Sequence, residues 1–250
     1  MRVAILGAGS IGTRHRATLE ALDCAVTSFD AVPRAGVRPV GEWRAEDYDA
    51  AVICTSWDQH LVYAQTAIGA GVPIYVEKPL GPLTETAIWR GLAVLTEERG
   101  IVTQVGYQTR FHPMYQGMRR ACPRPTMVRM HCTVDMTTWP GGVYGPVALE
   151  ASHDLDLALA CGAESRVVSL QDARGAYLRT WEMAEHGAEY AAVFACPAAL
   201  GTDMYTAAMG HFVACVLARE QTDIPLSDGV RVLEAVSQMT VEDGWHVWRS

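Results

Sequence analysis

A glycine-rich turn near the amino terminus constrains the fold of this chain more than any other feature. The apolar run 3–6 leads directly into Gly7-Ala8-Gly9-Ser10-Ile11-Gly12, and a helical pattern follows over 11–22. A strand, a Gly-x-Gly-x-x-Gly turn and a helix in this order are typical of a dinucleotide-binding βαβ unit. The sequence therefore predicts that the chain begins with such a unit.

Each glycine of this turn has a separate expected role. Gly7 allows the tight turn, Gly9 lets the backbone approach a pyrophosphate, and Gly12 lets the helix pack close to the strand. The phosphates would then meet the N–H groups of the first helical turn, at Ser10 and Ile11. A Gly-rich turn without a ligand is the alternative.

An acidic residue stands where the fingerprint requires one. A second apolar run, 25–29, ends in Asp30, about 20 residues after the glycines. Its carboxylate would accept hydrogen bonds from the adenosine ribose hydroxyls and repel a 2′-phosphate, which favours NAD over NADP. Arg34 lies within reach of a 2′-phosphate, so NADP stays open as the alternative.

The order of apolar patterns predicts two domains. Up to about residue 105, short apolar runs alternate with helical patterns, which predicts an α/β Rossmann domain with a parallel sheet. The second half has strand patterns at 126–136, 167–170, 176–179 and 190–195, and helical patterns at 155–161, 204–219 and 228–241. This grouping predicts an α+β domain. Two prolines near Cys122 interrupt a helical pattern, so we place the boundary between domains 1–122 and 123–250.

Composition narrows the classes of ligand and compartment. The net charge of -8 argues against nucleic acid and anionic membrane surfaces, because both attract clustered Lys and Arg, and it favours small molecules. Seven widely spaced cysteines without a Cys-x-x-Cys pair indicate reduced thiols and a cytoplasmic location. We expect no cleavable leader, because the first apolar run ends at the glycines, and no membrane span. The histidines show no metal-site spacing, and we expect no metal.

Four further motifs carry a resemblance to a known family. They are Thr55-Ser56-Trp57-Asp58-Gln59-His60, Val76-Glu77-Lys78-Pro79-Leu80, Gly106-Tyr107-Gln108-Thr109-Arg110-Phe111-His112-Pro113 and His153-Asp154-Leu155-Asp156. Together with the glycine turn, the chain resembles the glucose-fructose oxidoreductase, inositol dehydrogenase and MocA family over nearly its whole length. The resemblance implies a second domain built on an open, mostly antiparallel sheet, and a cis peptide before Pro79. Its members oxidise or reduce a hydroxyl or ketone on sugars, cyclitols and their derivatives.

Two residues are candidates for proton transfer. Hydride transfer from a carbinol needs a base for the hydroxyl proton while the cofactor takes the hydride. Lys78 lies between an apolar run and a proline, where desolvation favours proton exchange, although a solvated surface charge is the alternative. His153 precedes a helical pattern among acidic residues, and a helix-cap role is its alternative. The resemblance implies that both are catalytic, and that Asp156 shapes the substrate site.

One position departs from the family pattern. Inositol dehydrogenase-like members carry an aspartate four residues before the histidine, where this chain has Leu149. Glu150, one residue later, is the expected catalytic substitute. The relay of lysine, aspartate and histidine is therefore in doubt, and Lys78 and His153 remain its core.

The other motif residues are assigned to binding. Thr55, Ser56, His60 and Glu77 are expected to contact the cofactor, although Ser56 or Asp58 as the cap of the following helix is an alternative for that loop. Tyr107 and Gln108 are expected to line the substrate pocket, and Arg110 to orient the substrate, because its charge does not titrate near neutrality. Trp139 lies in the Gly-rich loop 139–145, which suits stacking on a sugar or a plain surface turn.

The chain is shorter than typical members, and the deficit falls between Asp156 and Met204. We therefore expect a shortened sheet, and the resemblance leaves a homo-oligomer through that sheet open. The predicted function is an NAD(P)-dependent oxidoreductase acting on a CH-OH group of a carbohydrate-like substrate. A catalytically silent, dinucleotide-binding regulatory protein is the main alternative, as in the family's galactose-regulon repressors. Glycosidic-bond elimination without net redox change is a third.

Overall fold

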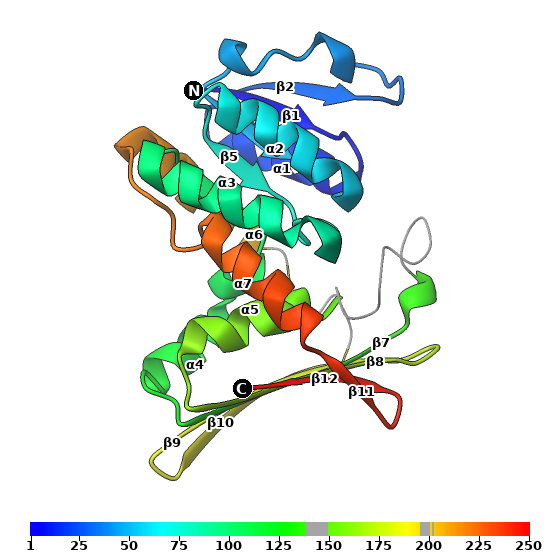
Figure 1. Cartoon of the computed structure of the whole chain (residues 1–250), viewed down its shortest axis with the longest axis vertical. Helices are drawn as coiled ribbons and strands as arrows, with labels where there is room; N and C mark the ends of the chain where they lie inside the picture. The colour runs from blue at the N-terminus through cyan, green and yellow to red at the C-terminus, as the bar shows by residue number, and fades with distance from the viewer. Residues whose placement is uncertain (139–149, 196–200, 202) are drawn as a thin grey trace. The chain divides into compact units, whose positions relative to one another are not determined.

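The computed structural model describes residues 1–138, 150–195, 201 and 203–250. The chain divides into two compact units, and each is made from two separate stretches (Figure 1). Unit 1 comprises Met1–Tyr107 and Tyr205–Val230, and unit 2 comprises Gln108–Met204 and Arg231–Ser250. The boundary expected at residues 122 and 123 lies inside unit 2, because the contacts of unit 2 begin at Gln108 and the helical stretch from Tyr205 returns to unit 1.

Unit 1 is built on a parallel sheet of six strands in the order β3-β2-β1-β4-β5-β6. The strands are β1 (Arg2–Leu6), β2 (Ala25–Asp30), β3 (Arg38–Pro39), β4 (Ala50–Ile53), β5 (Ile74–Val76) and β6 (Thr103–Val105). The strand order reverses direction between β1 and β4. In open parallel sheets of this kind, ligands bind outside the carboxyl ends of the strands at such a switch point.

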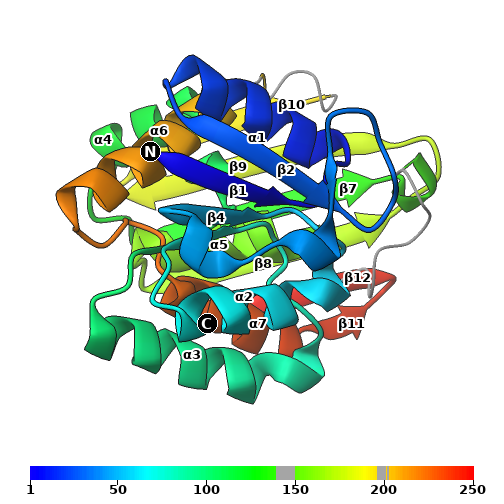
Figure 2. The same cartoon turned by 90° about the horizontal axis from the view of Figure 1, so that it is seen from above.

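Helices cover both faces of this sheet (Figure 2). On one face, α1 (Ser10–Ala21) and α6 (Asp203–Ala218) pack on β1 through buried side chains that include Leu19, Met209 and Phe212. The other face is covered by α2 (His60–Gly69) and α3 (Thr86–Arg99). Burial on both faces explains why β4, β5 and the part of β1 after Arg2 are apolar at successive positions rather than alternating. Short 3₁₀ segments fill the connections at Val40–Glu42, Ala45–Asp47, Trp57–Gln59 and Leu83–Glu85.

Unit 2 contains a second six-stranded sheet, in the order β10-β9-β7-β8-β12-β11. The strands are β7 (Met127–Val134), β8 (Ser165–Asp172), β9 (Tyr177–Glu185), β10 (Ala188–Phe194), β11 (Thr240–Glu242) and β12 (Trp245–Arg249). All neighbours pair antiparallel except β7 and β8, which are joined through α5 (Ser152–Cys161). Alternate residues of β7 are buried, from Val128 to Val134, and face the layer formed by α4 (Pro113–Ala121) and α5 (Figure 1). Two 3₁₀ segments, Gln108–Phe111 and Met136–Thr138, complete the unit.

The carboxyl-terminal hairpin corrects one prediction. The helix expected over 228–241 is α7 (Leu226–Ser237), which ends earlier, and strands β11 and β12 follow. Asp243 and Gly244 both have positive φ angles, 49° and 82°, as a type I′ turn requires. The Asp243-Gly244 pair is a hairpin-turn signal in the sequence. The helical spacing of the apolar residues before it led to the longer helix being predicted instead.

The two-domain fold class is confirmed: a Rossmann unit, and a second unit with an open, mostly antiparallel sheet.

The six cysteines that the structure describes are buried free thiols. Burial raises the pKa of Cys54 well above the ordinary value, and the Glu77 charge acts in the same direction. No helix among the described residues is long and apolar enough to cross a membrane.

Candidate active site

The glycine turn connects β1 to α1 and leaves no room for side chains at two of its three glycines. Gly7 has a φ of +97°, and a Cβ there would lie 2.5 Å from the carbonyl oxygen of Cys54. A Cβ on Gly12 would lie 1.9 Å from the carbonyl oxygen of Gly7. The close approach of α1 to β1 and β4 therefore depends on glycine at both positions, as the fingerprint predicts.

Gly9 is different, because the space beside it is open. A Cβ on Gly9 would meet no atom within 4 Å, and Gly9 caps α1 without a side-chain hydrogen bond. The turn Gly7–Gly12 and the amides of the first turn of α1 thus border an open space, which we call the glycine cradle. The helix dipole favours an anion there. Beyond β4, Thr55 Oγ1 is buried and has no hydrogen-bond partner among the described residues. These features fit a bound dinucleotide, with its pyrophosphate at Gly9 and a polar group on Thr55.

Asp30 ends β2 beside this cradle. Its Oδ2 accepts a hydrogen bond from the amide of Ala8 at 2.7 Å, and its Oδ1 accepts one from the amide of Val32 at 2.8 Å. A carboxylate has about four acceptor sites, so two remain for ribose hydroxyls. Arg34 Nε lies 4.0 Å from Asp30 Oδ2, and its side chain is half exposed. Asp30, expected to favour NAD, and Arg34, expected to be within reach of a 2′-phosphate, therefore lie together at this corner.

The turn after β5 carries the candidate lysine. Lys78 is partly buried, and the Lys78–Pro79 peptide is cis, as the resemblance implies. Glu77 is buried, and its Oε1 lies 2.7 Å from Nε2 of the fully buried His15 on α1. His60, the first residue of α2, lies with Nδ1 3.0 Å from the carbonyl oxygen of Pro79 and Nε2 3.0 Å from that of Thr55. Both Glu77 and His60, predicted as cofactor contacts, thus make contacts within the protein.

The electrostatics of His60 follow from its burial. Desolvation lowers the pKa of His60 below the ordinary value, while the two backbone carbonyls and the Glu77 charge oppose that change. The neutral ring carries one N–H, so it donates to one carbonyl at a time.

Neither Ser56 nor Asp58 caps α2: the N-cap is Gln59, which makes no side-chain cap bond.

Lys78 is also distinguished by composition. It is the only lysine in the chain, and the other 19 of the 20 basic Lys and Arg residues are arginines. Arginine can replace lysine wherever a fixed surface charge is sufficient, but its guanidinium does not release a proton near neutral pH. The single lysine of the chain therefore brings to this turn an amine that none of the 19 arginines offers. This count was a signal in the sequence that motif analysis did not use.

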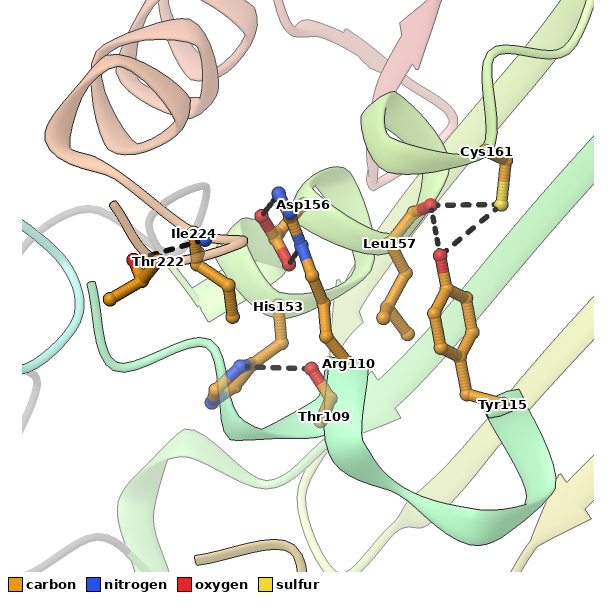
Figure 3. A network of polar contacts seen from close by, with 9 residues as sticks. All are labelled: Thr109, Arg110, Tyr115, His153, Asp156, Leu157, Cys161, Thr222 and Ile224. Carbon is orange, nitrogen blue, oxygen red and sulfur yellow. Dashed lines mark hydrogen bonds and ion pairs between the residues drawn. The ribbon is translucent and has the colours of Figure 1, made fainter. Parts of the chain in front are cut away.

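His153 lies in unit 2, at the start of α5 (Figure 3). Its Nδ1 lies 3.3 Å from Thr109 Oγ1, which fixes the orientation of the ring. One turn along α5, Asp156 is fully buried and binds Arg110 through two bonds, Nε to Oδ2 at 2.8 Å and Nη2 to Oδ1 at 2.5 Å. Asp156 and Arg110, both predicted to face substrate, are thus joined in a bidentate ion pair.

A second buried carboxylate fixes the same turn of α5. Asp154 Oδ1 accepts a hydrogen bond from Trp181 Nε1 at 3.1 Å, and Oδ2 lies 3.5 Å from Nη2 of Arg179 on β9. Burial alone would lower the pKa of Arg179, but the Asp154 charge raises it above the ordinary value. The helix turn that presents His153 is therefore tied to the sheet and to the 3₁₀ segment Gln108–Phe111.

The remaining predicted residues have less defined surroundings. Glu150 lies two residues before α5 begins, and Ser56 is exposed. Tyr107 and Gln108 are buried, in unit 1 and unit 2 respectively. Trp139, the loop 139–145 and Leu149 lie outside the described residues. Among the residues that are described, no group of three or more His, Cys, Asp or Glu could hold a metal ion.

The structure adds two residues that sequence analysis missed. One is His15, which pairs with Glu77 across 62 positions of the sequence. The other is Tyr205 of α6, whose ring lies under the guanidinium of Arg14 at 4.5 Å. Burial and then the Glu77 charge raise the pKa of Tyr205, whereas the charges of Arg14 and Lys78 lower it. The Lys78 charge thus acts on the hydroxyl of Tyr205, an interaction that only the tertiary structure reveals.

Comparison with known proteins gives the context of this arrangement. No family model matches the chain. It is 28% identical over 198 residues to inositol 2-dehydrogenase 4 of Saccharopolyspora erythraea, covering 70% of this chain and 58% of the relative. It is 29% identical over 131 residues to UDP-N-acetylglucosamine 3-dehydrogenase of Acidithiobacillus ferrooxidans, covering 48% of this chain and 41% of the relative. The matched regions thus span 41% and 58% of these two curated relatives.

Solved structures share the fold at low identity. A scyllo-inositol dehydrogenase from Lactobacillus casei, with bound NAD(H) and scyllo-inositol, superposes with a TM-score of 0.76 at 15% identity, covering 95% of each chain. The fold and the glycine cradle define a two-unit protein with a Rossmann unit. The relatives that the chain matches are inositol and sugar-nucleotide dehydrogenases, which supports the resemblance to the glucose-fructose oxidoreductase, inositol dehydrogenase and MocA family.

Proposed function

We propose that this protein is an NAD-dependent oxidoreductase that transfers a hydride between nicotinamide and a hydroxyl or ketone of a sugar, cyclitol or related derivative. The observation that carries the proposal is the turn Glu77-Lys78-Pro79, where the only lysine of the chain follows a buried strand at the ligand-binding edge of the sheet. The named dehydrogenase relatives support the reaction class.

The chemistry divides between the cofactor and two side chains. When bound, NAD accepts or donates the hydride and so supplies the difficult electronics of the reaction. Lys78 and His153 handle the hydroxyl proton, because an amine and an imidazole can each take up and give up a proton, whereas the guanidinium of the 19 arginines stays protonated. The Thr109 contact orients the imidazole of His153. Glu150 assists in place of the aspartate that is leucine at position 149.

The cofactor assignment rests on the glycine cradle and Asp30. Gly7, Gly9, Ser10, Ile11 and Gly12 receive the pyrophosphate, and Asp30 receives the adenosine ribose. In this proposal Thr55 and Ser56 contact the nicotinamide half, while His60 and Glu77 support it through the turn that carries Lys78. The buried, unpartnered Thr55 hydroxyl supports that assignment.

On the substrate side, we assign Tyr107, Gln108, Trp139, Arg110 and Asp156 to binding of the carbohydrate-like molecule. The bidentate pair leaves little freedom for Arg110, so it contributes shape and a fixed charge rather than proton exchange. Buried free thiols fit a cytoplasmic location, and the open sheet of unit 2 is the surface through which we propose a homo-oligomer.

One observation favours a second function. Leu149 stands where inositol dehydrogenase-like members have an acidic residue, so a protein that binds the dinucleotide without turnover, as a regulator, is the alternative. Purified protein incubated with NAD and a panel of sugars, inositols and nucleotide sugars should produce NADH, followed by its absorbance. An inert protein whose melting temperature still rises with NAD would support the regulator instead.

The choice of cofactor has its own test. Saturating NAD should raise the melting temperature more than NADP does, and Asp30→Ala should reverse that order because Arg34 then faces the 2′-phosphate without the competing carboxylate. Asp30→Ala also removes acceptors from the amides of Ala8 and Val32, so the unliganded melting temperature must be compared first. A larger stabilisation of the wild type by NADP would reject the NAD assignment.

A further inference from the structure

Two buried histidines hold the turn Glu77-Lys78-Pro79 from opposite sides of Lys78. His15 contacts Glu77, the residue before the lysine, and His60 contacts Pro79, the residue after it. His15 belongs to α1 and His60 to α2, and these helices lie on opposite faces of the parallel sheet (Figure 2). Their side chains are 0% and 1% exposed, so neither is an accidental surface contact.

The contact of His15 has a defined donor. A carboxylate only accepts hydrogen bonds, so Nε2 carries the proton donated to Glu77 Oε1 at 2.7 Å. Nδ1 is buried and has no partner among the described residues, which leaves Glu77 as the single polar contact that the ring makes. Gly106 leaves no room for a side chain beside Glu77, because a Cβ there would lie 2.9 Å from the carboxyl carbon of Glu77. The buried carboxylate is thus enclosed and fixed by its surroundings.

The contact of His60 joins two loops. Its ring nitrogens lie between the carbonyls of Thr55, in the loop after β4, and Pro79, in the turn after β5. Both loops leave the ligand-binding edge of the sheet, next to the glycine cradle. His60 therefore sets the position of the lysine-bearing turn relative to the loop that carries the buried Thr55 hydroxyl.

We infer that His15 and His60 are positioning residues, which fix the main chain on either side of Lys78 and so aim its amine at the nicotinamide. The inference rests on the proposed function, since it assumes that Lys78 acts next to a bound dinucleotide. Misplacing a catalytic group by about 1 Å can cost roughly 10²-fold in rate, so loss of either contact should lower kcat without removing the cofactor site.

Conservative substitutions can separate the contacts of His60. Asparagine places an amide N–H near the position of Nδ1 and can keep the bond to Pro79, whereas glutamine reaches the position of Nε2 and can keep the bond to Thr55. His60→Asn should therefore retain most of kcat, and His60→Gln should lose about 10-fold to 100-fold. The NAD dissociation constant should stay within about threefold in both, since each variant loses no more than one hydrogen bond outside the cradle.

The contact of His15 needs a variant that still folds. Leucine at position 15 alone would take the His15 donor away from the buried Glu77 carboxylate, which is destabilising. The double variant His15→Leu/Glu77→Leu replaces the pair by apolar groups and should fold, yet lose kcat to the same extent as His60→Gln. His15→Gln, which can still donate to Glu77, should rescue most of the rate. Thr96→Val is the control, because Thr96 is equally buried but its side-chain hydroxyl donates only to Ala93, within α3.

A spectroscopic measurement reports the position of Lys78 without turnover. Reductive methylation with ¹³C-formaldehyde labels the amino terminus and one side chain, because the chain has one lysine. In the wild type, His15→Gln, His60→Asn and Thr96→Val, NAD should shift the dimethyl-Lys78 resonance. In His60→Gln and the double leucine variant, saturating NAD should produce less than half of that shift.

The two readouts separate failure of this inference from failure of the proposed function. If wild type turns over, and the kcat and the NAD-induced shift of His60→Gln and the double leucine variant equal those of Thr96→Val, the positioning role is rejected. If no variant turns over but the shifts differ as expected, the positioning role stands and the enzymatic function is rejected.

Discussion

Replacing Lys78 with arginine should lower kcat by about 10³-fold, the typical contribution of a general acid–base group, and leave the NAD dissociation constant within about threefold. The guanidinium keeps the positive charge next to the cofactor but cannot release a proton near neutral pH. Steady-state rates with the best substrate of the panel, and NAD titrations by thermal shift, measure the two effects separately. The other 19 residues of the Lys and Arg count are arginines, so this one substitution removes the only side-chain amine of the chain.

Two controls sharpen that experiment. Arg16→Lys adds a lysine on α1, where the side chain pairs with Glu20 at the surface, and should leave the rate unchanged. Lys78→Ala should be partly rescued by a small primary amine in solution if the missing function is proton transfer. Retention of more than a tenth of kcat by Lys78→Arg would show that the charge, and not the proton exchange, is what the site requires.

Local patterns predicted unit 1 well because its features are local in sequence. The glycine turn, the strand before it and Asp30 lie within 30 residues, and each role follows from backbone geometry that glycine or a carboxylate alone satisfies. The apolar runs predicted the central strands correctly within a few residues, because strand residues buried on both faces are apolar at successive positions.

The contacts between site residues that the sequence did not predict depend on the tertiary structure. His15 and Glu77 are 62 positions apart, and Arg110 and Asp156 are 46 apart, so their pairing depends on the sheet order and on the crossover helices. The sequence predicts Glu77 and His60 as cofactor contacts and Arg110 and Asp156 as substrate contacts, and the structure adds a protein partner for each. A residue type indicates what chemistry is available, but its partners in the fold cannot be predicted from that type alone.

The hairpin of β11 and β12 shows a second limit. Apolar residues of α7 continue past Ser237 at spacings that suit a helix, so periodicity extended the helix to Val241. The positive φ angles at Asp243 and Gly244 show that turn chemistry prevailed over that periodicity. Turn residues deserve as much weight as hydrophobic spacing where the two disagree.

Two alanine substitutions in the glycine cradle should have large effects of different kinds. One should lower the stability of the fold, and the other should weaken NAD binding. Gly12→Ala should lower the free energy of unfolding by about 3 kcal/mol, because its Cβ would lie 1.9 Å from the carbonyl of Gly7 and must push α1 away from β1. Gly9→Ala should leave that free energy within about 0.5 kcal/mol, since its Cβ meets no atom within 4 Å. Urea denaturation of the unliganded protein measures both.

The same pair separates folding from cofactor binding. Gly9→Ala should raise the NAD dissociation constant at least roughly tenfold, because the methyl group occupies the space where the pyrophosphate approaches the amides of α1. Gly91→Ala is the control: Gly91 is exposed in α3, and alanine there should stabilise the helix by about 0.5–1 kcal/mol with unchanged NAD binding. If Gly9→Ala bound NAD as tightly as Gly91→Ala, the open cradle would not be the phosphate site, and the Rossmann unit would hold its ligand elsewhere.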